Sequence, residues 1–363
     1  TENLQVTGSF KVRGAYYKIS QLSDEEKAHG VIACSAGNHA QGVALAAAHS
    51  GIPSLICIPD GAPISKVEAT KSYGAQVELV KGVYDDAYNR AVELQKERNL
   101  TFIHPFNDPD VIAGQGTIGL ELLKQLPDMD AVIVPVGGGG LISGVAFAIK
   151  SLNPKCKVYG VQAAGAASMK ASLEQNGPHS LTGVSTFADG IAVKCPGDLT
   201  YELCSKYVDD VVTVSDDETA TAILALIEQQ KLITEGAGAV AVAAAMFNKV
   251  DVKGKKVACI LSGGNIDVTI LSKVINRGLM KAGRSTELII EMIDKPGQLK
   301  EVSALIADLG ANVVSVHHDR GGEDTDINAV TCIAETRNWA HVEQIEKAIS
   351  DAGYHIVHRQ NIG

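Results

Sequence analysis

The sequence has a shortage of positive charge and no long apolar run, and each absence excludes a class of protein. It has 32 lysine and arginine residues and 42 aspartate and glutamate residues, so the formal net charge is −10. A broad nucleic-acid interface needs a basic surface, so we expect no nucleic-acid partner. The longest apolar run, residues 237–247, is much shorter than the ~18 residues of a membrane span. We therefore expect no membrane segment.

Paired cysteine motifs and the common catalytic signatures are also missing. The seven cysteines are scattered, with no CxxC pair, which predicts reduced thiols, no disulfide frame and no zinc site. No HExxH, GxSxG or protein-kinase motif occurs. Nothing in the sequence resembles a signal peptide, and with the reduced thiols we expect a cytoplasmic location. Because the chain begins with Thr1 and not Met, we also expect its natural start to be missing.

Short β-branched runs alternate with longer amphipathic stretches from about residue 31 to residue 275. Strands are predicted at residues 31–34, 54–58, 76–80, 131–136, 157–161, 211–214 and 257–261. Helices are predicted at residues 39–49, 65–73, 84–98, 111–126, 141–152 and 216–231. Nearly continuous apolar strands separated by helices predict an α/β fold with a parallel sheet covered on both faces.

The pattern changes near residue 281. Strands are predicted at 287–293, 312–319, 326–335 and 355–360, with helices at 298–309 and 339–352. This βαββαβ order is that of a ferredoxin-like domain. We therefore divide the chain into a large domain over residues 1–280, a linker over 281–286 and a small domain over 287–363.

One strand runs into four successive glycines, Gly137, Gly138, Gly139 and Gly140, followed by a predicted helix that begins with Leu141. Such a loop can turn several backbone N–H groups toward one point, and the helix N-terminus adds partial positive charge. The pattern predicts a phosphate site, although it fits neither a P-loop nor a dinucleotide fingerprint. The alternative is that these glycines only allow close helix–strand packing.

Two other strand ends carry polar, glycine-containing loops, residues 35–42 (SAGNHAQG) and 262–265 (SGGN). Ligands of open α/β sheets bind at the carboxyl ends of strands, so the three loops can converge on one site. Taken alone, His39 is as well explained as a helix-start residue. No residue in these loops supplies an evident reactive group, so a phosphorylated cofactor is expected to carry the chemistry.

Several segments resemble fold-type II (tryptophan synthase β-like) pyridoxal-phosphate enzymes, and most closely the threonine dehydratases (threonine ammonia-lyases). Residues 7–15 (TGSFKVRGA) are similar to the segment that holds the Schiff-base lysine of that family. Residues 35–42, 137–141, 234–238 (TEGAG) and 262–265 follow in the family's order. The tail, with DKPGQL at 294–299 and GANV at 310–313, is similar to an ACT domain, an amino-acid-sensing module. Relatives begin earlier, so the first helix and strand of the family are expected to be absent.

The resemblance implies roles for individual residues toward pyridoxal 5'-phosphate. Lys11 would form the Schiff base and act as the base at Cα, and Phe10 would pack near the ring, unless it is simply core. Asn38 would bind the pyridoxal 3-oxygen, and Ser262 would face the pyridine nitrogen. Glu235 would lie near the cofactor, unless it only caps the following helix.

The resemblance also implies the surroundings of the phosphate and of the substrate carboxylate. Backbone N–H groups of residues 137–141 would bind the phosphate. The carboxylate pocket would be bounded by Ser35, Asn38 and His39.

Two positions separate this chain from the related serine racemases. Ala36 stands where the racemases carry the serine that handles a proton on the second face of the substrate, so dehydration is favoured over racemisation. Residues 162–168 (QAAGAAS) lack the carboxylates that bind a divalent metal in that relative, so no metal site is expected.

The resemblance therefore implies dehydration of L-threonine to 2-oxobutanoate and ammonia, with L-serine as a lesser substrate. A serine dehydratase or racemase and a non-catalytic amino-acid sensor are the alternatives, and a biosynthetic role toward isoleucine and a catabolic role are both open. A homodimer or homotetramer is expected. An amino-acid effector would bind the tail at two turns, which we expect at one end of the sheet and which contain Asp294, Gly297, Gly310 and Asn312.

Overall fold

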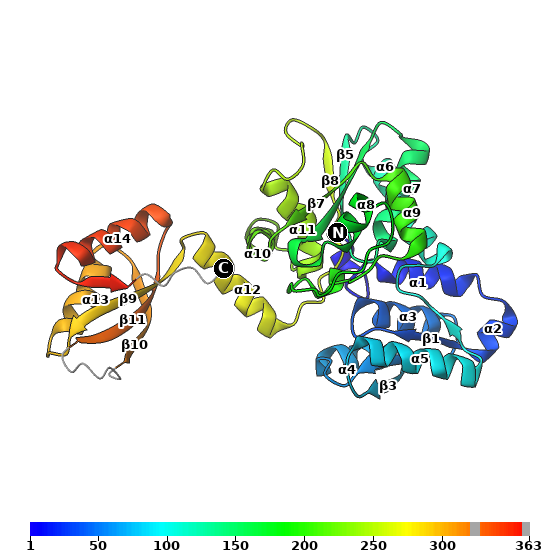
Figure 1. The fold of residues 1–363 in the computed structure, drawn as a ribbon, viewed down its shortest axis with the longest axis horizontal. Coiled ribbons are helices and arrows are strands. Elements are labelled where there is room, and N and C mark those ends of the chain that lie inside the picture. The colour runs from blue at the N-terminus through cyan, green and yellow to red at the C-terminus, as the bar shows by residue number, and fades with distance from the viewer. Residues whose placement is uncertain (320–326, 358–363) are drawn as a thin grey trace. The chain divides into compact units, whose positions relative to one another are not determined.

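The computed structural model describes residues 1–319 and 327–357, which form two compact units. The first unit ends at Leu271 and the second begins at Ser272, so the division falls within helix α12 (Val268–Lys281). Each unit has its own hydrophobic core. In Figure 1 the first unit runs from blue to yellow-green and the second from yellow to red.

A four-stranded parallel sheet in the order β3-β2-β1-β4 forms one half of the first unit. Alternate residues of β1 face opposite sides: Val31 and Ala33 pack with α1 and α3, whereas Ile32 and Cys34 pack with α5. Helices therefore cover both faces, which explains the continuous apolar character of this strand. The elements are β1 (Val31–Cys34), β2 (Ser54–Pro59), β3 (Gln76–Val80), β4 (Thr101–Phe102), α1 (Lys11–Ser20), α2 (Asp24–His29), α3 (Asn38–His49), α4 (Ile64–Ser72) and α5 (Tyr84–Arg98).

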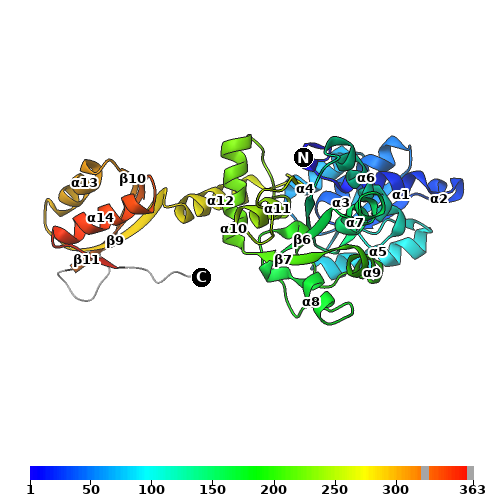
Figure 2. The same cartoon turned by 90° about the horizontal axis from the view of Figure 1, so that it is seen from above.

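A second parallel sheet, in the order β7-β6-β5-β8, forms the other half. Helices α6, α7 and α9 contribute to one core cluster on this sheet, and α11 packs against β5, β6 and β7. The elements are β5 (Ala131–Pro135), β6 (Lys157–Ala163), β7 (Asp210–Val214), β8 (Val257–Cys259), α6 (Pro109–Gln125), α7 (Gly140–Leu152), α8 (Ser168–Glu174), α9 (Asp198–Tyr207), α10 (Asp216–Ala225) and α11 (Gly236–Met246). Figure 2 shows β6 and β7 of this sheet from above.

The second unit is an antiparallel sheet with two helices. Its strand order is β10-β11-β9-β12, and every pairing is antiparallel. One face of the sheet packs with both helices around a core that includes Leu288, Val330 and Ile345. The elements are β9 (Ser285–Ile293), α13 (Gln298–Asp308), β10 (Asn312–Asp319), β11 (Ile327–Glu335), α14 (Trp339–Asp351) and β12 (His355–Val357).

The predicted fold class, a parallel-sheet α/β region followed by a ferredoxin-like domain, is confirmed. The structure adds that the parallel strands form two sheets of four, not one. The predicted helix at 216–231 is α10 followed by a π-helical turn, Leu226–Gln230, and ends where Lys231 adopts a left-handed φ of 59°. Residue 326 of the predicted strand 326–335 and residues 358–360 of the last predicted strand lie outside the described residues.

Helix α1, which begins at Lys11, is an element that periodicity does not reveal. It buries only Gly14, Ala15 and Ile19, so its apolar face is narrow. Gly14 lies where a Cβ atom would be 2.2 Å from the Gln115 side chain on α6. The helix therefore depends on close packing with α6, which only the tertiary structure supplies.

No helix in residues 1–319 or 327–357 combines the length and the apolar composition needed to cross a membrane.

Candidate active site

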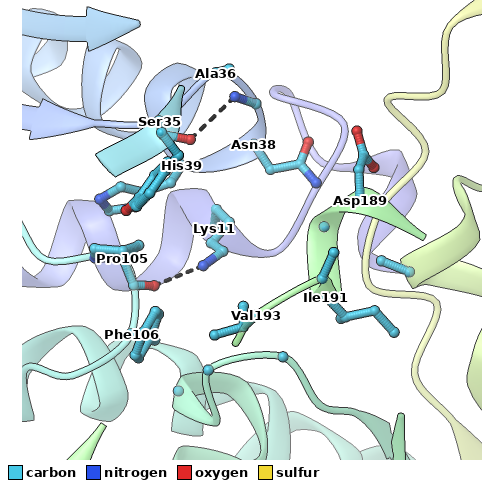
Figure 3. A pocket seen from close by; sticks show the side chains of 18 of the residues that line it. Lys11, Ser35, Ala36, Asn38, His39, Pro105, Phe106, Asp189, Ile191 and Val193 are labelled. Carbon is cyan, nitrogen blue, oxygen red and sulfur yellow. Dashed lines mark hydrogen bonds between the residues drawn. The ribbon is translucent and has the colours of Figure 1, made fainter. Parts of the chain in front are cut away.

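A cavity of about 830 Å³ lies where loops from both parallel sheets meet. It is lined by every residue that the sequence analysis assigned to cofactor or substrate, namely Phe10, Lys11, Ser35, Asn38, His39, Gly137, Gly138, Gly139, Gly140, Leu141, Glu235 and Ser262. Figure 3 shows Lys11 reaching into this cavity, with Ser35, Ala36, Asn38 and His39 around it. The structure therefore brings these side chains together, while their individual roles stay predictions.

Lys11 is the first residue of α1, and its ammonium lies inside the cavity. The Nζ atom donates a hydrogen bond to the carbonyl oxygen of Pro105 at 2.7 Å and lies 5.3 Å from the centre of the Phe10 ring. Burial lowers the pKa of Lys11 to about 8, although the negative charge of Glu235 opposes the shift. A lysine with a lowered pKa has a larger neutral fraction near pH 7, and the neutral amine is the nucleophile and base.

The segment before Lys11 is held against the loop that follows β8. Ser9 and Gly263 form an antiparallel bridge, the Phe10 N–H donates to the Ser262 carbonyl at 3.0 Å, and the Gly264 N–H donates to Gly8 at 2.9 Å. Gly8 has a φ of +68°, which a glycine adopts without strain. These bonds place Lys11 at the carboxyl end of the second sheet.

The four-glycine loop connects β5 to the N-terminus of α7. Among the residues that the structure describes, no acceptor is found for the N–H groups of Gly137, Gly138 and Gly139. Gly139 has a φ of +98°, and α7 begins directly after it. Unpartnered amides at a helix N-terminus form an anion site.

The packing alternative for these glycines also has support. A Cβ atom on Gly138 would be 2.4 Å from the Phe106 ring, and one on Gly140 would be 2.9 Å from the Phe106 Cα atom. The Gly138 carbonyl accepts a hydrogen bond from Thr200 Oγ1 at 2.6 Å. The loop is therefore tightly packed against Phe106 and Thr200 while its N–H groups remain available, so the two interpretations are compatible.

Asn38 and Glu235 form a hydrogen-bonded pair on the cavity wall. Asn38 Nδ2 donates to Glu235 Oε1 at 2.6 Å, and Asn265 Nδ2 donates to Asn38 Oδ1 at 2.7 Å. Burial and the negative charge of Asp189 raise the pKa of Glu235 to about 7, against the Asn38 hydrogen bond and the charges of Lys66 and Lys11. Glu235 can therefore gain or lose a proton near neutral pH. The alternative of a simple helix cap is not supported, since its side chain makes no capping bond to α11.

His39 and His104 are held neutral beside the cavity. Burial, helped by the charge of Lys11, lowers the pKa of His39 to about 3 and that of His104 to about 4. His39 Nε2 bonds the Ile103 carbonyl at 2.8 Å, so it carries the hydrogen, and its buried Nδ1 has no partner. His104 Nδ1 accepts the Asn107 N–H at 2.8 Å. Neither ring is a cation at neutral pH.

The hydroxyl groups of Ser35 and Ser262 form hydrogen bonds with backbone groups near the cavity. Ser35 Oγ accepts the Gly37 N–H at 3.1 Å, and Ser262 Oγ donates to the Ala237 carbonyl at 3.2 Å. The Ser262 hydroxyl rotates about its C–O bond, so it can donate its hydrogen to the Ala237 carbonyl or to an acceptor in the cavity. Ala36 lines the same cavity and offers no titratable group.

Sequence reasoning missed an ion pair on the cavity wall. Lys66 Nζ on α4 lies 2.8 Å from Asp189 Oδ2, and both residues line the cavity. Asp189 also raises the pKa of Glu235. Residues 188–190 (ADG) carry no pattern that identifies this role, because the partner is more than a hundred positions away in the sequence.

The expectation that the two regulatory turns lie at one end of the second unit's sheet is wrong. Asn312 pairs with Glu335, which pairs with Ser285 at the start of β9, whereas Asp294 follows Ile293 at the end of β9. Strands β9 and β10 both run antiparallel to β11 and are therefore parallel to each other. Gly297 precedes α13 and Gly310 follows it, so the helix and the length of β9 separate the turns.

The segment in which no metal site is expected is hydrogen-bonded by a neutral side chain. Gln162 donates to the Ala166 carbonyl at 3.2 Å and accepts the Lys170 N–H at 2.9 Å. In the described part of the chain, no group of three or more metal-binding side chains is found.

Comparison with known proteins gives the same two parts. The pyridoxal-phosphate dependent enzyme family matches residues 1–263, and the ACT domain family matches residues 286–350. An L-threonine ammonia-lyase of Thermotoga maritima is 55% identical over 98% of this chain and 89% of its own length.

Two solved structures resemble the larger part. The processed form of threonine deaminase isoform 2 from Solanum lycopersicum is 44% identical, with a TM-score of 0.73, over 76% of this chain and 81% of its own. Maize serine racemase is 38% identical, with a TM-score of 0.72, over 77% of this chain and 87% of its own.

The neutral state of His39 predicts a pH-dependent term in stability. The unfolded chain protonates this ring below its ordinary pKa of 6.5, whereas the folded chain resists until about pH 3. Lowering the pH from 7 to 5 therefore favours unfolding by about 2 kcal/mol through this group. Glu235 has the opposite sign, so the comparison is between wild type and His39→Gln by denaturant unfolding at both pH values. An identical pH dependence in the two proteins would contradict the assignment.

Proposed function

The chain belongs to the family of pyridoxal-phosphate dependent enzymes, and from that premise we propose that it is an L-threonine ammonia-lyase that forms 2-oxobutanoate and ammonia. The observation that carries the proposal is the cavity in which the Lys11 ammonium, the N–H groups of the glycine loop and the alanine at position 36 come together. The 55% identity with the Thermotoga maritima L-threonine ammonia-lyase supports threonine as the substrate. Serine, which lacks only the β-methyl group, would be a lesser substrate.

The residues of the cavity fit pyridoxal phosphate. The unpartnered N–H groups of Gly137, Gly138 and Gly139 match the oxygens of a phosphate, and the partial positive charge of the α7 N-terminus favours the same group. Lys11 provides the amine that would hold the carbonyl group, and Ser262 provides a neutral hydroxyl for the ring nitrogen. When bound, this cofactor supplies the electron sink that allows an amino acid to lose its α-proton and its β-hydroxyl group.

The chain's own groups handle the proton and the carboxylate. Because the pKa of Lys11 is about 8, a fraction of its side-chain amine is neutral near pH 7. This neutral amine would accept the α-proton of the substrate and become an ammonium. The loop of residues 35–39 would bind the substrate carboxylate with the Ser35 hydroxyl and the N–H groups at the start of α3. The lowered pKa values of His39 and His104, about 3 and about 4, make both rings weak bases, so Lys11 is the stronger base beside them.

A serine racemase is the second candidate, and the likeness to the maize serine racemase structure favours it. Racemisation needs one group to remove a proton and another to deliver one on the opposite face. Ala36 lines the cavity and cannot carry a proton, so elimination is the reaction that this cavity supports. A silent amino-acid sensor would not need a lysine buried beside unpartnered amides.

The ACT domain would give the enzyme allosteric control by an amino acid. Because its two turns lie at opposite ends of one sheet, a site that uses both would require residues from a second copy of the chain. This requirement supports a homodimer or homotetramer as the regulated form.

Replacing Lys11 with alanine should lower threonine turnover by at least about 10³-fold, because both the amine and the base are lost. Release of 2-oxobutanoate measures the loss, and circular dichroism checks the fold. Lys18→Ala is the matched control, since Lys18 lies on the same helix and pairs with Asp108 at 3.0 Å outside the cavity. Equal turnover in Lys11→Ala and Lys18→Ala would rule out the role.

Replacing Ala36 with serine should introduce racemisation of serine while dehydration continues, because the new hydroxyl adds a proton carrier. The measurement is conversion of L-serine to D-serine and solvent deuterium at Cα of recovered serine. Ala36→Thr adds a hydroxyl with extra bulk, and Ala36→Val, of similar bulk without a hydroxyl, is the control. If the Ala36→Ser and Ala36→Val variants form equally little D-serine and incorporate equally little deuterium, position 36 does not decide between dehydration and racemisation.

Isoleucine or valine should shift the apparent threonine affinity of the full-length protein by roughly 5- to 150-fold, the usual range of allosteric coupling. Protein lacking residues 285–363 should retain threonine chemistry and lose the shift. Calorimetry on the full chain measures effector binding directly. A truncated protein that still responds would place the effector outside the ACT domain.

A further inference from the structure

Asn265, the last residue of the loop 262–265, makes two hydrogen bonds to which the proposed function assigns no role. Its Nδ2 atom donates to the carbonyl oxygen of Thr7 at 2.7 Å and to Asn38 Oδ1 at 2.7 Å. Thr7 is buried and belongs to the segment that leads to Lys11. One amide group therefore joins the lysine segment to the Asn38 side chain.

We infer that Asn265 is a positioning residue that fixes the amide of Asn38 so that it presents N–H, and not C=O, to the ring oxygen of the cofactor. The inference rests on the proposed function for the place of the cofactor, and on the hydrogen-bond network for the orientation. Asn38 lines the cavity beside Lys11 (Figure 3).

The Thr7 carbonyl determines which groups donate and which accept in this hydrogen-bond network, because it cannot act as a donor. A backbone carbonyl only accepts hydrogen bonds, so Asn265 must turn its NH₂ group toward Thr7. The same NH₂ group also donates a hydrogen bond to the Asn38 amide, so the acceptor in Asn38 must be its oxygen. The NH₂ group of Asn38 is consequently on the other side, where it donates to Glu235 at 2.6 Å.

Glu235 cannot set this orientation by itself. Burial raises the pKa of its carboxyl to about 7, and a protonated carboxyl donates as well as accepts. Either orientation of Asn38 could therefore find a partner at Glu235. The Thr7 carbonyl removes this ambiguity through Asn265, because its acceptor character does not change with pH.

The test compares two substitutions that act differently on the Asn38 amide. Asn265→Asp keeps the shape but only accepts when ionised, so it would turn Asn38 around. Asn265→Ala removes the hydrogen bond to Asn38, so the Asn38 amide can adopt either orientation. Positioning predicts that N265D weakens binding of pyridoxal phosphate by about 10- to 100-fold and N265A by about 2- to 10-fold. A packing role predicts losses that are the same in the wild-type protein and in an Asn38→Ala background.

Dissociation constants are measured on protein freed of pyridoxal phosphate and titrated with it, and the absorbance spectrum of the bound cofactor is recorded. We expect N265D to shift the absorbance band, because the ring oxygen loses a donor. Asn3→Asp is the matched control: Asn3 Nδ2 donates to the Ile233 carbonyl at 3.0 Å in the neighbouring segment, and its spectrum should be unchanged.

A double-mutant cycle decides whether Asn265 acts through Asn38. In an Asn38→Ala background, N265D and N265A should add little to the loss of cofactor affinity. Additive losses, or a native spectrum and affinity in N265D, would overturn the inference. If N265D does not fold, the cycle with N265A gives the same decision. These readouts need no substrate, so a wild-type protein that fails to act on threonine would refute the proposed function and leave this result standing.

Discussion

The contact between residues 7–10 and residues 262–265 is the interaction on which the active site depends. It joins segments from the two ends of the larger unit through a β-bridge, backbone hydrogen bonds and the Asn265 side chain. Closing so long a loop costs conformational entropy, and burial of the two sheets' cores must offset it. Once formed, the contact places Lys11 beside the glycine loop and Asn38, so the base, the phosphate site and the ring contacts all take their positions from it.

Burial sets the charges of the cavity. Removal from water lowers the pKa values of Lys11, His39 and His104 and raises that of Glu235. Because both histidines stay neutral near pH 7, neither adds a positive charge beside Lys11. Glu235 titrates close to neutrality and faces Asn38, so its protonation state bears on the hydrogen bonds around the cofactor ring. One physical cause, the low dielectric of a partly enclosed cavity, therefore acts with opposite signs on bases and acids.

The second unit shows how strand direction limits a functional prediction. Its βαββαβ order follows from the alternation of short apolar strands and amphipathic helices, and the structure confirms that order. The placement of Asp294 and Asn312 depends on which strands run parallel, and β9 and β10 are parallel because each pairs antiparallel with β11. The turns at 294–297 and 310–312 were expected at one end of the sheet, whereas the topology puts them at opposite ends.

The sequence by itself determined the fold class, the boundaries of most elements and the three loops that line the cavity, because strand burial, helix caps and glycine positions are local properties. It also indicated Lys11, Asn38 and Ser262 through a family resemblance. Only the tertiary structure decided that the parallel strands form two sheets and that Lys66 meets Asp189. It alone decided that Asn265 holds both Thr7 and Asn38. These features join residues far apart in the chain, and their geometry arises from packing that no local pattern encodes.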